Sequence, residues 1–453
     1  MSLGRAGGRR RDQDNLPPGS RSRRPSRIFG ALLTTSDSVA HMGRVVITVI
    51  GGGAFAPRLC EALARSVDLP EVELRLWARR TDRVRILAEH GARRLAALRP
   101  GWTLQGADSL DAALADSTIV VLLVRVGGLE ARAWDETFPR RFGLAGDEGL
   151  GAGGIANAWR TLPELRRIGQ AIRCAAPAAR VINLMAPLGV TTRLLLEQGL
   201  DAVGLCDLPL LTIESWLAAT GHARSDASWR YGGLNHLGWF WNVRAAGEDV
   251  LRRLAASSPG SPGAQPLDPP TLERFHAAPL RYFYQVFDTD AGRRLGLERP
   301  PDRAQRLGEL TETLLRRFSE SPGARVTEEE ARPTPWLDRV VAPVVSSLLG
   351  GPPHEGVVNL RNGTLLPELP SALVVEVAAT FSPGGARPVA PGPLPDPVAG
   401  FLRAMARAET LTFQAADQRD RGALADAIRA LPLGIPETHV HELVALAQRT
   451  EAA

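Results

Sequence analysis

Between residues 44 and 206, short runs of aliphatic and β-branched residues alternate with longer stretches in which apolar residues recur at helical spacing. Strands that are apolar throughout are typical of parallel sheets, because helices cover both faces of such a sheet. The alternation therefore predicts an α/β fold with a Rossmann-like, doubly wound parallel sheet. The expected elements are a strand, a glycine triplet and a helix within 44–67, strands at 72–78, 118–124, 181–185 and 202–206, and helices at 81–98, 155–174 and 188–198.

The alternation ends near residue 210, and the rest of the chain predicts an α+β domain. We therefore expect three parts, which are a basic tail at 1–43, a Rossmann-like domain at 44–210 and a C-terminal domain at 211–453. Within the last part we expect a strand at 229–244, helices at 302–319 and 326–349, strands within 356–380, exposed loops at 257–270 and 382–397, and closing helices.

The positive charge of the chain is concentrated at its beginning. The formal net charge is +5, and residues 1–41 contain eight of the 54 basic residues and three of the 49 acidic ones, which leaves 46 of each elsewhere. The body thus lacks the charge excess of a nucleic-acid-binding protein. The tail is rich in Arg, Gly, Pro and Ser and is expected to be disordered. It is either an artefact before a start at Met42 or a real extension that meets acidic partners.

Other features of the composition exclude several classes of protein. Every basic residue is arginine, so a Schiff-base lysine, a pyridoxal phosphate anchor and a P-loop lysine are excluded. No apolar run reaches the roughly 18 residues of a membrane helix, and the first residues do not resemble a secretory signal. The three cysteines, Cys60, Cys174 and Cys206, are too few for a disulfide framework, which favours the cytoplasm.

The glycine triplet Gly51, Gly52 and Gly53 follows the first strand and precedes the first helix. Glycines at this place let the backbone approach a pyrophosphate, which then lies at the helix N-terminus. We therefore expect an NAD-type cofactor there, with Phe55 beside the turn; a nucleotide-free α/β domain is the alternative. The strand at 72–78 ends without the acid that NAD-binding domains usually have. Arg79 follows it and would suit the 2′-phosphate of NADP, unless it belongs to a solvated charge cluster.

Two further stretches contain residue types that bind metals. "VGLCDLPLLTIESW" (203–216) has Cys206 at the end of a predicted strand, and "YGGLNHLGWFW" (231–241) contains His236. By themselves, these residues fit either a buried cysteine and a core histidine or a shared metal site. Thiolate and imidazole together suit a borderline transition metal better than magnesium or calcium.

Five ordered motifs resemble glycoside hydrolase family 4, near its 6-phospho-β-glucosidase and 6-phospho-α-glucosidase members. They extend over about 44–440 and read "VVITVIGGGAFAP", "LVRVGGLEARAWDETFPRRFGLAGDEGLGAGGIANAWRTLP", "GLCDLP", "GLNHLGW" and "LRYFY". The resemblance implies bound NAD⁺ and a divalent metal, usually manganese. It also implies oxidation at C3 of the sugar, removal of the C2 proton, elimination of the C1 group and addition of water. A cytoplasmic homodimer or homotetramer is implied as well, with a C-terminal domain for substrate binding and oligomerisation.

The resemblance assigns roles to individual residues. Cys206 and His236 are the implied metal ligands, and Asp207 is the implied proton donor to the leaving group, although it also suits a helix N-cap. The tyrosine base of the family is missing, and the candidate for a relocated base is Tyr282, which otherwise matches a packing tyrosine of the family motif, as does Tyr284. The implied substrate-binding residues, for which surface ion pairing is the alternative, are Arg125, Glu148 and Asn235.

Several residues depart from the family pattern, and all of them concern the sugar. The family base is a tyrosine where this chain has Ala278 and Pro279, which is why Tyr282 is the expected replacement. Other departures are Ala54 for Ser, Asp147 for Gln, Gly149 for Thr and Ala186 for Asn.

Three functions follow from this pattern. The first is a glycosidase that acts on a sugar or phospho-sugar with NAD and manganese. The second is an NAD(P)-dependent sugar oxidoreductase, since hydride transfer needs no base at C2. The third is a nucleotide-binding paralogue that has lost catalysis. None of the three requires nucleic acid or a membrane.

Overall fold

The first strand, β1 (Val45–Gly51), has apolar side chains on both of its faces. In the computed structural model, which describes residues 44–256, 265–298 and 300–449, Ile47 and Val49 pack into the core on one side of the sheet, while Ile50 packs on the other. Both faces are thus covered, which confirms the predicted doubly wound arrangement.

Six parallel strands form the first half of a single sheet. Their order is β3 (Trp102–Gly106), β2 (Val72–Trp77), β1, β4 (Ile119–Leu123), β5 (Arg180–Asn183) and β6 (Asp201–Gly204). This is the Rossmann order, and the direction of winding changes between β1 and β4. Ligands bind such sheets at this switch point, outside the carboxyl ends of the strands.

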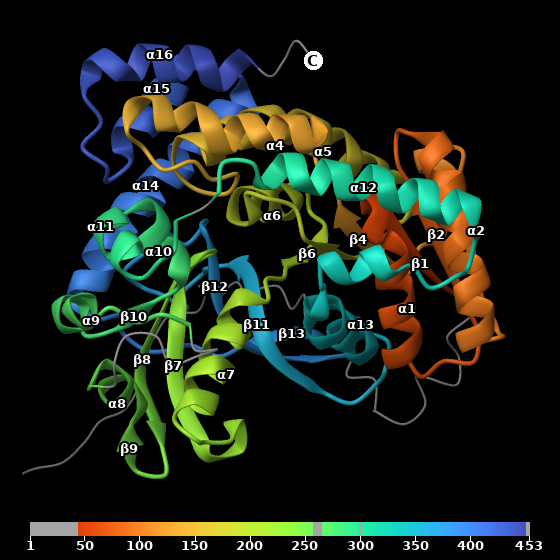
Figure 1. Cartoon of the computed structure of the whole chain (residues 1–453), viewed down its shortest axis with the longest axis horizontal. Coiled ribbons are helices and arrows are strands. Elements are labelled where there is room, and N and C mark those ends of the chain that lie inside the picture. The colour runs from red at the N-terminus through yellow and green to blue at the C-terminus, as the bar shows by residue number, and fades with distance from the viewer. Residues whose placement is uncertain (1–43, 257–264, 299, 450–453) are drawn as a thin grey trace, which may run out of the picture. The chain divides into compact units, whose positions relative to one another are not determined.

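Helices cover the two faces of this parallel half (Figure 1). On one side, α1 (Ala56–Ser66) and α2 (Thr81–Leu98) contribute to the larger core, and α2 has the predicted bounds. On the other side lie α3 (Leu110–Leu114), α5 (Gly151–Ala175) and α6 (Leu188–Glu197).

The second half of the sheet is antiparallel and continues directly from β6. Its strands follow in the order β11 (His354–Arg361), β12 (Val374–Ser382), β7 (Ala227–Leu234), β8 (Leu237–Ala245) and β10 (Ala278–Pro279), with β9 (Glu248–Asp249) beside β8 and β13 (Gly385–Pro388) beside β12. The predicted boundary at 210 falls within α7 (Leu208–Ala219), and Arg44–Ala453 is one compact unit by its contacts. The division at 210 therefore stays a prediction, and the tail at 1–43 lies outside the described residues.

The remaining helices surround the antiparallel half and the top of the parallel half. The C-terminal helices α14 (Asp396–Gln418), α15 (Arg421–Ala430) and α16 (Glu437–Gln448) pack against α5 (Figure 1). The others are α4 (Gly128–Thr137), α8 (Val250–Ala256), α9 (Pro269–Phe275), α10 (Arg281–Val286), α11 (Thr289–Arg294), α12 (Arg303–Glu320) and α13 (Ala342–Leu348), with 3-10 turns at η1 (Gly53–Phe55), η2 (Phe138–Phe142), η3 (Arg224–Asp226) and η4 (Thr327–Ala331). Among the described residues, no helix is both long enough and apolar enough to cross a membrane.

Two predicted elements were wrong in detail. The strand expected at 229–244 is the hairpin β7–β8, since the backbone reverses at Asn235 and His236, where His236 has a φ of 64°. The helix expected at 326–349 is broken into η4, an irregular link, the π-helical turn η5 (Leu337–Val341) and α13. The link contains Pro333 and Pro335, which lack the N–H that a helix needs. The pattern also missed β3, α3, α4, β9, β10, β13 and the four helices α8 to α11.

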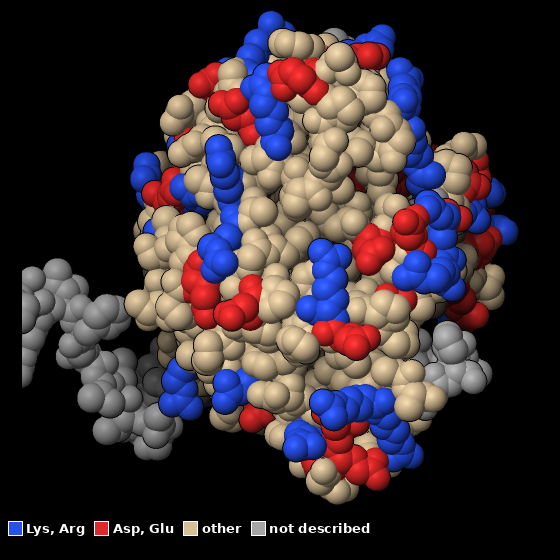
Figure 2. Space-filling model, turned by 90° about the vertical axis from the view of Figure 1, so that its left-hand side faces the viewer, with Lys and Arg blue, Asp and Glu red and all other residues tan. Residues whose placement is uncertain are grey.

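Charged side chains are intermingled on the surface. Figure 2 shows basic and acidic residues next to each other over one face. Exposed pairs such as Arg429 with Glu437, at 2.5 Å, and Arg325 with Glu330, at 2.9 Å, are of this kind. This distribution agrees with the balanced charge of the body.

Candidate active site

A cavity of about 210 Å³ opens at the carboxyl ends of β4, β5 and β6. Doubly wound sheets bind their ligands at this place, outside the carboxyl ends of the strands. Its lining comes from seven separate parts of the chain, which are the end of β4, the loop before α5, α5 itself, the segment between β5 and α6, the end of β6, the β7–β8 turn and the segment around Trp336. Six of the residues predicted from the sequence line it together: Arg125, Glu148, Cys206, Asp207, Asn235 and His236.

Cys206 and Asp207 lie at the end of β6, where the chain enters α7. Burial, together with the charges of Glu376 and Asp207, raises the pKa of the Cys206 thiol well above its ordinary value, while a hydrogen bond with Asn235 opposes this shift. Burial also raises the pKa of the Asp207 carboxyl. Asp207 holds the N-cap position of α7, but its side chain makes no capping hydrogen bond to this helix. The carboxyl lines the cavity instead.

His236 stands in the tight turn between β7 and β8 and stacks on Tyr282. The two ring centroids are 3.9 Å apart, and the rings are inclined by 13°. Tyr282 is in the first turn of α10, whereas Ala278, at the place of the family tyrosine, is fully buried in β10 opposite Phe240. Tyr282 is therefore the tyrosine that reaches the cavity residues.

The other tyrosine of α10 has a different environment. Tyr284 is fully buried, and its hydroxyl accepts a hydrogen bond from the backbone N–H of Asp268 at 3.2 Å. Burial raises the pKa of its phenol. Tyr284 is therefore a buried packing residue with a hydrogen bond from the backbone of Asp268.

Arginines gather at one side of the cavity. The Arg125 guanidinium contacts the Glu148 carboxylate, which also lies 3.3 Å from Arg132 Nη2. Burial and the neighbouring charges of Arg132 and Arg332 lower the pKa of Arg125 to about 9. Burial, Arg132 and Arg303 lower the pKa of Arg332 to about 10. Such mutual repulsion is relieved by an anion, so this group of arginines suits a negatively charged ligand.

The glycine turn lies next to the same cavity, at the switch point between β1 and β4. Gly51 has a φ of +90°, and a Cβ there would lie 2.8 Å from the carbonyl oxygen of Leu123, which lines the cavity. Gly53 has a φ of +51°, and a Cβ there would meet nothing within 4 Å. Phe55 ends the turn, with Arg332 Cζ 4.9 Å from the centroid of its ring. The turn is thus closed towards the sheet and open at Gly53.

Arg79 lies away from this cavity, directly after β2, and is exposed. Its neighbour Arg80 is paired with Asp82 at 2.9 Å. The end of β2 therefore carries an exposed arginine at the place where the ribose of a dinucleotide would lie.

Cys206 and His236 could contribute two ligands to a metal ion. In the part of the chain that the structure describes, no group of three or more His, Cys, Asp or Glu side chains is arranged to hold one. A thiolate and an imidazole in one cavity still fit a borderline transition metal whose remaining ligands come from substrate or water. Cys206 and His236 therefore fit a cation whose remaining coordination positions face the cavity.

Sequence reasoning missed three residues of this region. Trp336 and Asn157 line the cavity, and the Asn157 amide donates to the carbonyls of Glu148, at 2.8 Å, and Ala186, at 3.1 Å. The two prolines before Trp336 were a signal that the predicted helix is interrupted just before this residue. The third is Glu376, a fully buried carboxylate in the apolar strand β12, where the charge itself was the signal.

The residues that depart from the family pattern at 147 and 149 shape the loop before α5. Asp147 is 1% exposed, and its Oδ1 accepts from the backbone N–H groups of Gly149, at 2.7 Å, and Leu150, at 3.0 Å. A Cβ at Gly149 would lie 3.6 Å from His236 Nδ1. Asp147 thus holds the loop, and Gly149 leaves room beside the imidazole.

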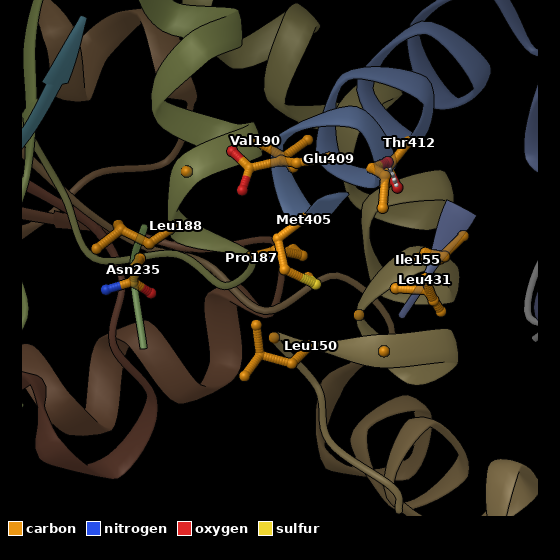
Figure 3. A pocket seen from close by; sticks show the side chains of 15 residues that line it. Leu150, Ile155, Pro187, Leu188, Val190, Asn235, Met405, Glu409, Thr412 and Leu431 are labelled. Carbon is orange, nitrogen blue, oxygen red and sulfur yellow. Dashed lines mark hydrogen bonds between the residues drawn. The ribbon is translucent and has the colours of Figure 1, made fainter. Parts of the chain in front are cut away.

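A second, smaller cavity of about 40 Å³ adjoins the first and shares Leu188 and Asn235 with it. Figure 3 shows that Glu409, from α14, projects between Val190 and Met405. Its carboxyl reaches Gly189 at the start of α6, where a Cβ would lie 2.5 Å from Oε1. Burial raises the pKa of Glu409 to about 7, and the charge of Arg193 opposes this.

The chain is similar to known proteins over most of its length. The model described as "Family 4 glycosyl hydrolase" matches residues 46–221, and that of the "Family 4 glycosyl hydrolase C-terminal domain" matches residues 231–433. A probable 6-phospho-beta-glucosidase of Bacillus subtilis is 26% identical, over 83% of this chain and 88% of its own. The 6-phospho-beta-glucosidase BglT of Thermotoga maritima is 25% identical, over 86% and 94%. A structure of the T. maritima 6-phospho-beta glucosidase with manganese, NAD⁺ and glucose-6-phosphate superposes with a TM-score of 0.77, at 22% identity, over 90% of this chain and 98% of its own.

Proposed function

The chain belongs to family 4 of the glycosyl hydrolases, and we propose that it is an NAD- and divalent-metal-dependent glycosidase of the 6-phospho-glucosidase type. One observation carries the proposal. Six residues from four parts of the chain, which the family motifs mark as metal, acid and substrate residues, line a single cavity beside the glycine turn. Two relatives that resemble the chain over more than four fifths of its length are described as 6-phospho-beta-glucosidases, which supports the same reaction.

The cofactor is proposed to bind over the glycine turn. Its pyrophosphate would meet the open side of Gly53 and the start of α1, while the exposed Arg79 would allow NADP as well as NAD. Phe55 would border the bound cofactor. Cys206 and His236 would hold the divalent cation, most readily manganese. When bound, NAD⁺ would supply a hydride acceptor, and the cation would supply positive charge where the enediolate develops.

The proton transfers are assigned to two side chains of this chain. Asp207 would give a proton to the glycosidic oxygen as the C1 bond breaks, because its carboxyl faces the cavity rather than the helix. Tyr282 would accept the C2 proton of the oxidised sugar, since its ring lies against His236. The small residues Gly149 and Ala186 would leave space on the sugar side.

The substrate is proposed to be a sugar that carries a phosphate. Arg125 and Arg132 both contact the Glu148 carboxylate, Arg132 is also paired with Glu136 at 2.9 Å, and Arg332 adds a third positive charge to these two carboxylates. A phosphate would offset this excess of positive charge. Asn235 would contact the sugar from the β7–β8 turn. The assembly, a homodimer or homotetramer in the cytoplasm, is carried over from the family.

A second candidate function is favoured by Ala278. Because this residue occupies the place of the family base and is fully buried, a sugar oxidoreductase that stops after hydride transfer would need no replacement for it. Turnover of aryl 6-phosphoglucosides with NAD⁺ and Mn²⁺, under reducing conditions and in deuterated water, separates the two. Aglycone release that a chelator abolishes, with deuterium appearing at C2, supports the glycosidase. Accumulation of NADH without aglycone supports the oxidoreductase, and bound cofactor with neither product identifies a non-catalytic paralogue.

A further inference from the structure

Glu376 is a fully buried carboxylate in the middle of an apolar strand. Its neighbours in β12, Val375 and Val377, are also fully buried. The carboxylate accepts three hydrogen bonds: Oε2 from the Tyr231 hydroxyl at 2.5 Å, and Oε1 from Asn235 Nδ2 at 2.9 Å and from Asn359 Nδ2 at 2.8 Å. A buried charge is tolerated when it is fully hydrogen-bonded, and these three donors satisfy that requirement.

The three donors come from different elements that meet at the join between the two halves of the sheet. Glu376 lies opposite Asn359 of β11 and opposite Gly233 of β7. Asn359 in turn lies opposite Gly204 of β6, two residues before Cys206. Glu376 therefore stands between the strand that ends at Cys206 and the hairpin that carries His236.

Asn235 connects Glu376 to the cavity. Its amide donates a hydrogen bond to Glu376, and Asn235 lines the cavity together with Cys206. Asn235 directly precedes His236, whose φ of 64° is unusual for a residue other than glycine. A contact that holds Asn235 therefore acts beside Cys206 and on the turn of His236 at once.

An apolar residue at position 376 would pack in the strand without the free-energy cost of a buried charge. The strand therefore does not need this carboxylate for its own stability. We propose that Glu376 is a positioning residue which, by holding Asn235, sets the Cys206 thiol and the His236 imidazole for one divalent cation. This inference rests on the proposed metal site. Outer partners of metal ligands typically change metal affinity by about 10- to 100-fold.

The test is a titration of the purified full-length chain with Co²⁺, followed by the absorption bands of the cobalt–thiolate bond. Glu376→Gln keeps the shape of the side chain but removes the charge, and we expect Co²⁺ to bind about 10- to 100-fold more weakly. Tyr231→Phe removes one donor and leaves the Asn235 bond in place, so its loss of affinity should be smaller. Binding of NAD⁺ at the glycine turn, which neither Glu376 nor Tyr231 contacts through a hydrogen bond, should be unchanged in both variants.

A second variant covers the case in which Glu376→Gln does not fold. Asn235→Ala cuts the connection at the turn and leaves Glu376 with two donors, and it should weaken Co²⁺ binding to a similar degree. In the double variant Glu376→Gln/Asn235→Ala the two losses of Co²⁺ affinity should not add, since both substitutions disturb the same contact between Glu376 and Asn235. Wild-type affinity in Asn235→Ala or Glu376→Gln, or additive losses, would overturn the inference. A wild-type chain that binds no Co²⁺, or that shows the same bands after Cys206→Ser, would instead overturn the proposed metal site.

Discussion

The ring of Tyr282 stacks on the ring of His236, with centroids 3.9 Å apart and planes inclined by 13°. The stack joins α10 to the β7–β8 turn, two elements 46 residues apart in the chain. It places a phenol next to an implied metal ligand, although the place of the family tyrosine is taken by a buried alanine. The proposed proton transfers can therefore be tested on Asp207, which lines the cavity, and on Tyr282, which stacks on the lining residue His236.

Tyr282→Phe should lower kcat for aryl 6-phosphoglucosides by about 10²- to 10⁴-fold, the range of a lost general base. The ring and its stack on His236 are retained, so the Tm should change little. Tyr284→Phe is the matched control from the same helix. It loses the hydrogen bond from the Asp268 N–H, so it should lower stability by about 1 kcal/mol and preserve turnover. Equal activity of Tyr282→Phe and wild type would remove Tyr282 from the mechanism.

Cys206→Ser and His236→Ala should each abolish turnover that depends on added Mn²⁺, because each removes a ligand of the proposed cation. Mn²⁺ binding, followed by electron paramagnetic resonance, should weaken by more than about tenfold in both variants. Cys174→Ser is the control, since Cys174 is an exposed thiol on α5. If both ligand variants retain full metal-dependent turnover, the metal assignment is wrong.

Gly51→Ala and Gly53→Ala should affect the glycine turn in different ways. At Gly51 a Cβ would lie 2.8 Å from the Leu123 backbone, so the variant should disturb the turn itself and lower the Tm. At Gly53 a Cβ meets open space, so the cost is the positive φ alone, about 1–2 kcal/mol. We expect Gly53→Ala to fold and to bind NAD⁺ more weakly in a fluorescence titration. Unchanged NAD⁺ affinity in Gly53→Ala would argue against a pyrophosphate over this residue.

Glu409→Gln should make stability less dependent on pH. The pKa of Glu409 rises from an ordinary 4.5 to about 7 in the folded chain, so the folded state holds the proton more tightly than the unfolded state. The resulting stability is fully present below pH 4.5 and is lost as the pH rises through about 7, by at most about 3 kcal/mol. Glutamine stays neutral, so the variant should gain Tm relative to wild type between pH 5 and 8.

The control for this experiment is Glu442→Gln, an exposed residue on α16, which reports the loss of a single surface charge. Both variants would be melted at several pH values in matched ionic strength. A Tm difference between Glu409→Gln and wild type that does not grow with pH would show that the Glu409 carboxyl is not held neutral by its surroundings.

The local pattern was sufficient for most of the parallel half of the fold. Five of its six strands were predicted from short, mainly apolar runs, and the amphipathic period of α2 predicted this helix to the residue. The strand β3 was missed because its sequence, WTLQG, is largely polar. The glycine turn was also predictable, because a strand, glycines and a helix follow each other within a few residues. The hairpin turn at Asn235 was missed because aromatic residues continue the strand pattern on both sides of it.

Only the tertiary structure decided how distant segments meet. Cys206 and His236 line one cavity because β11 and β12 are inserted between β6 and β7, and no local period encodes that pairing. The hydrogen bond from Tyr231 to Glu376 connects residues that are 145 positions apart in the chain. Only the register of the paired strands brings such a donor to a buried carboxylate. The sequence by itself therefore determined the fold class and the kinds of side chain available for catalysis. Long-range pairing of strands determined which of those side chains share the cavity.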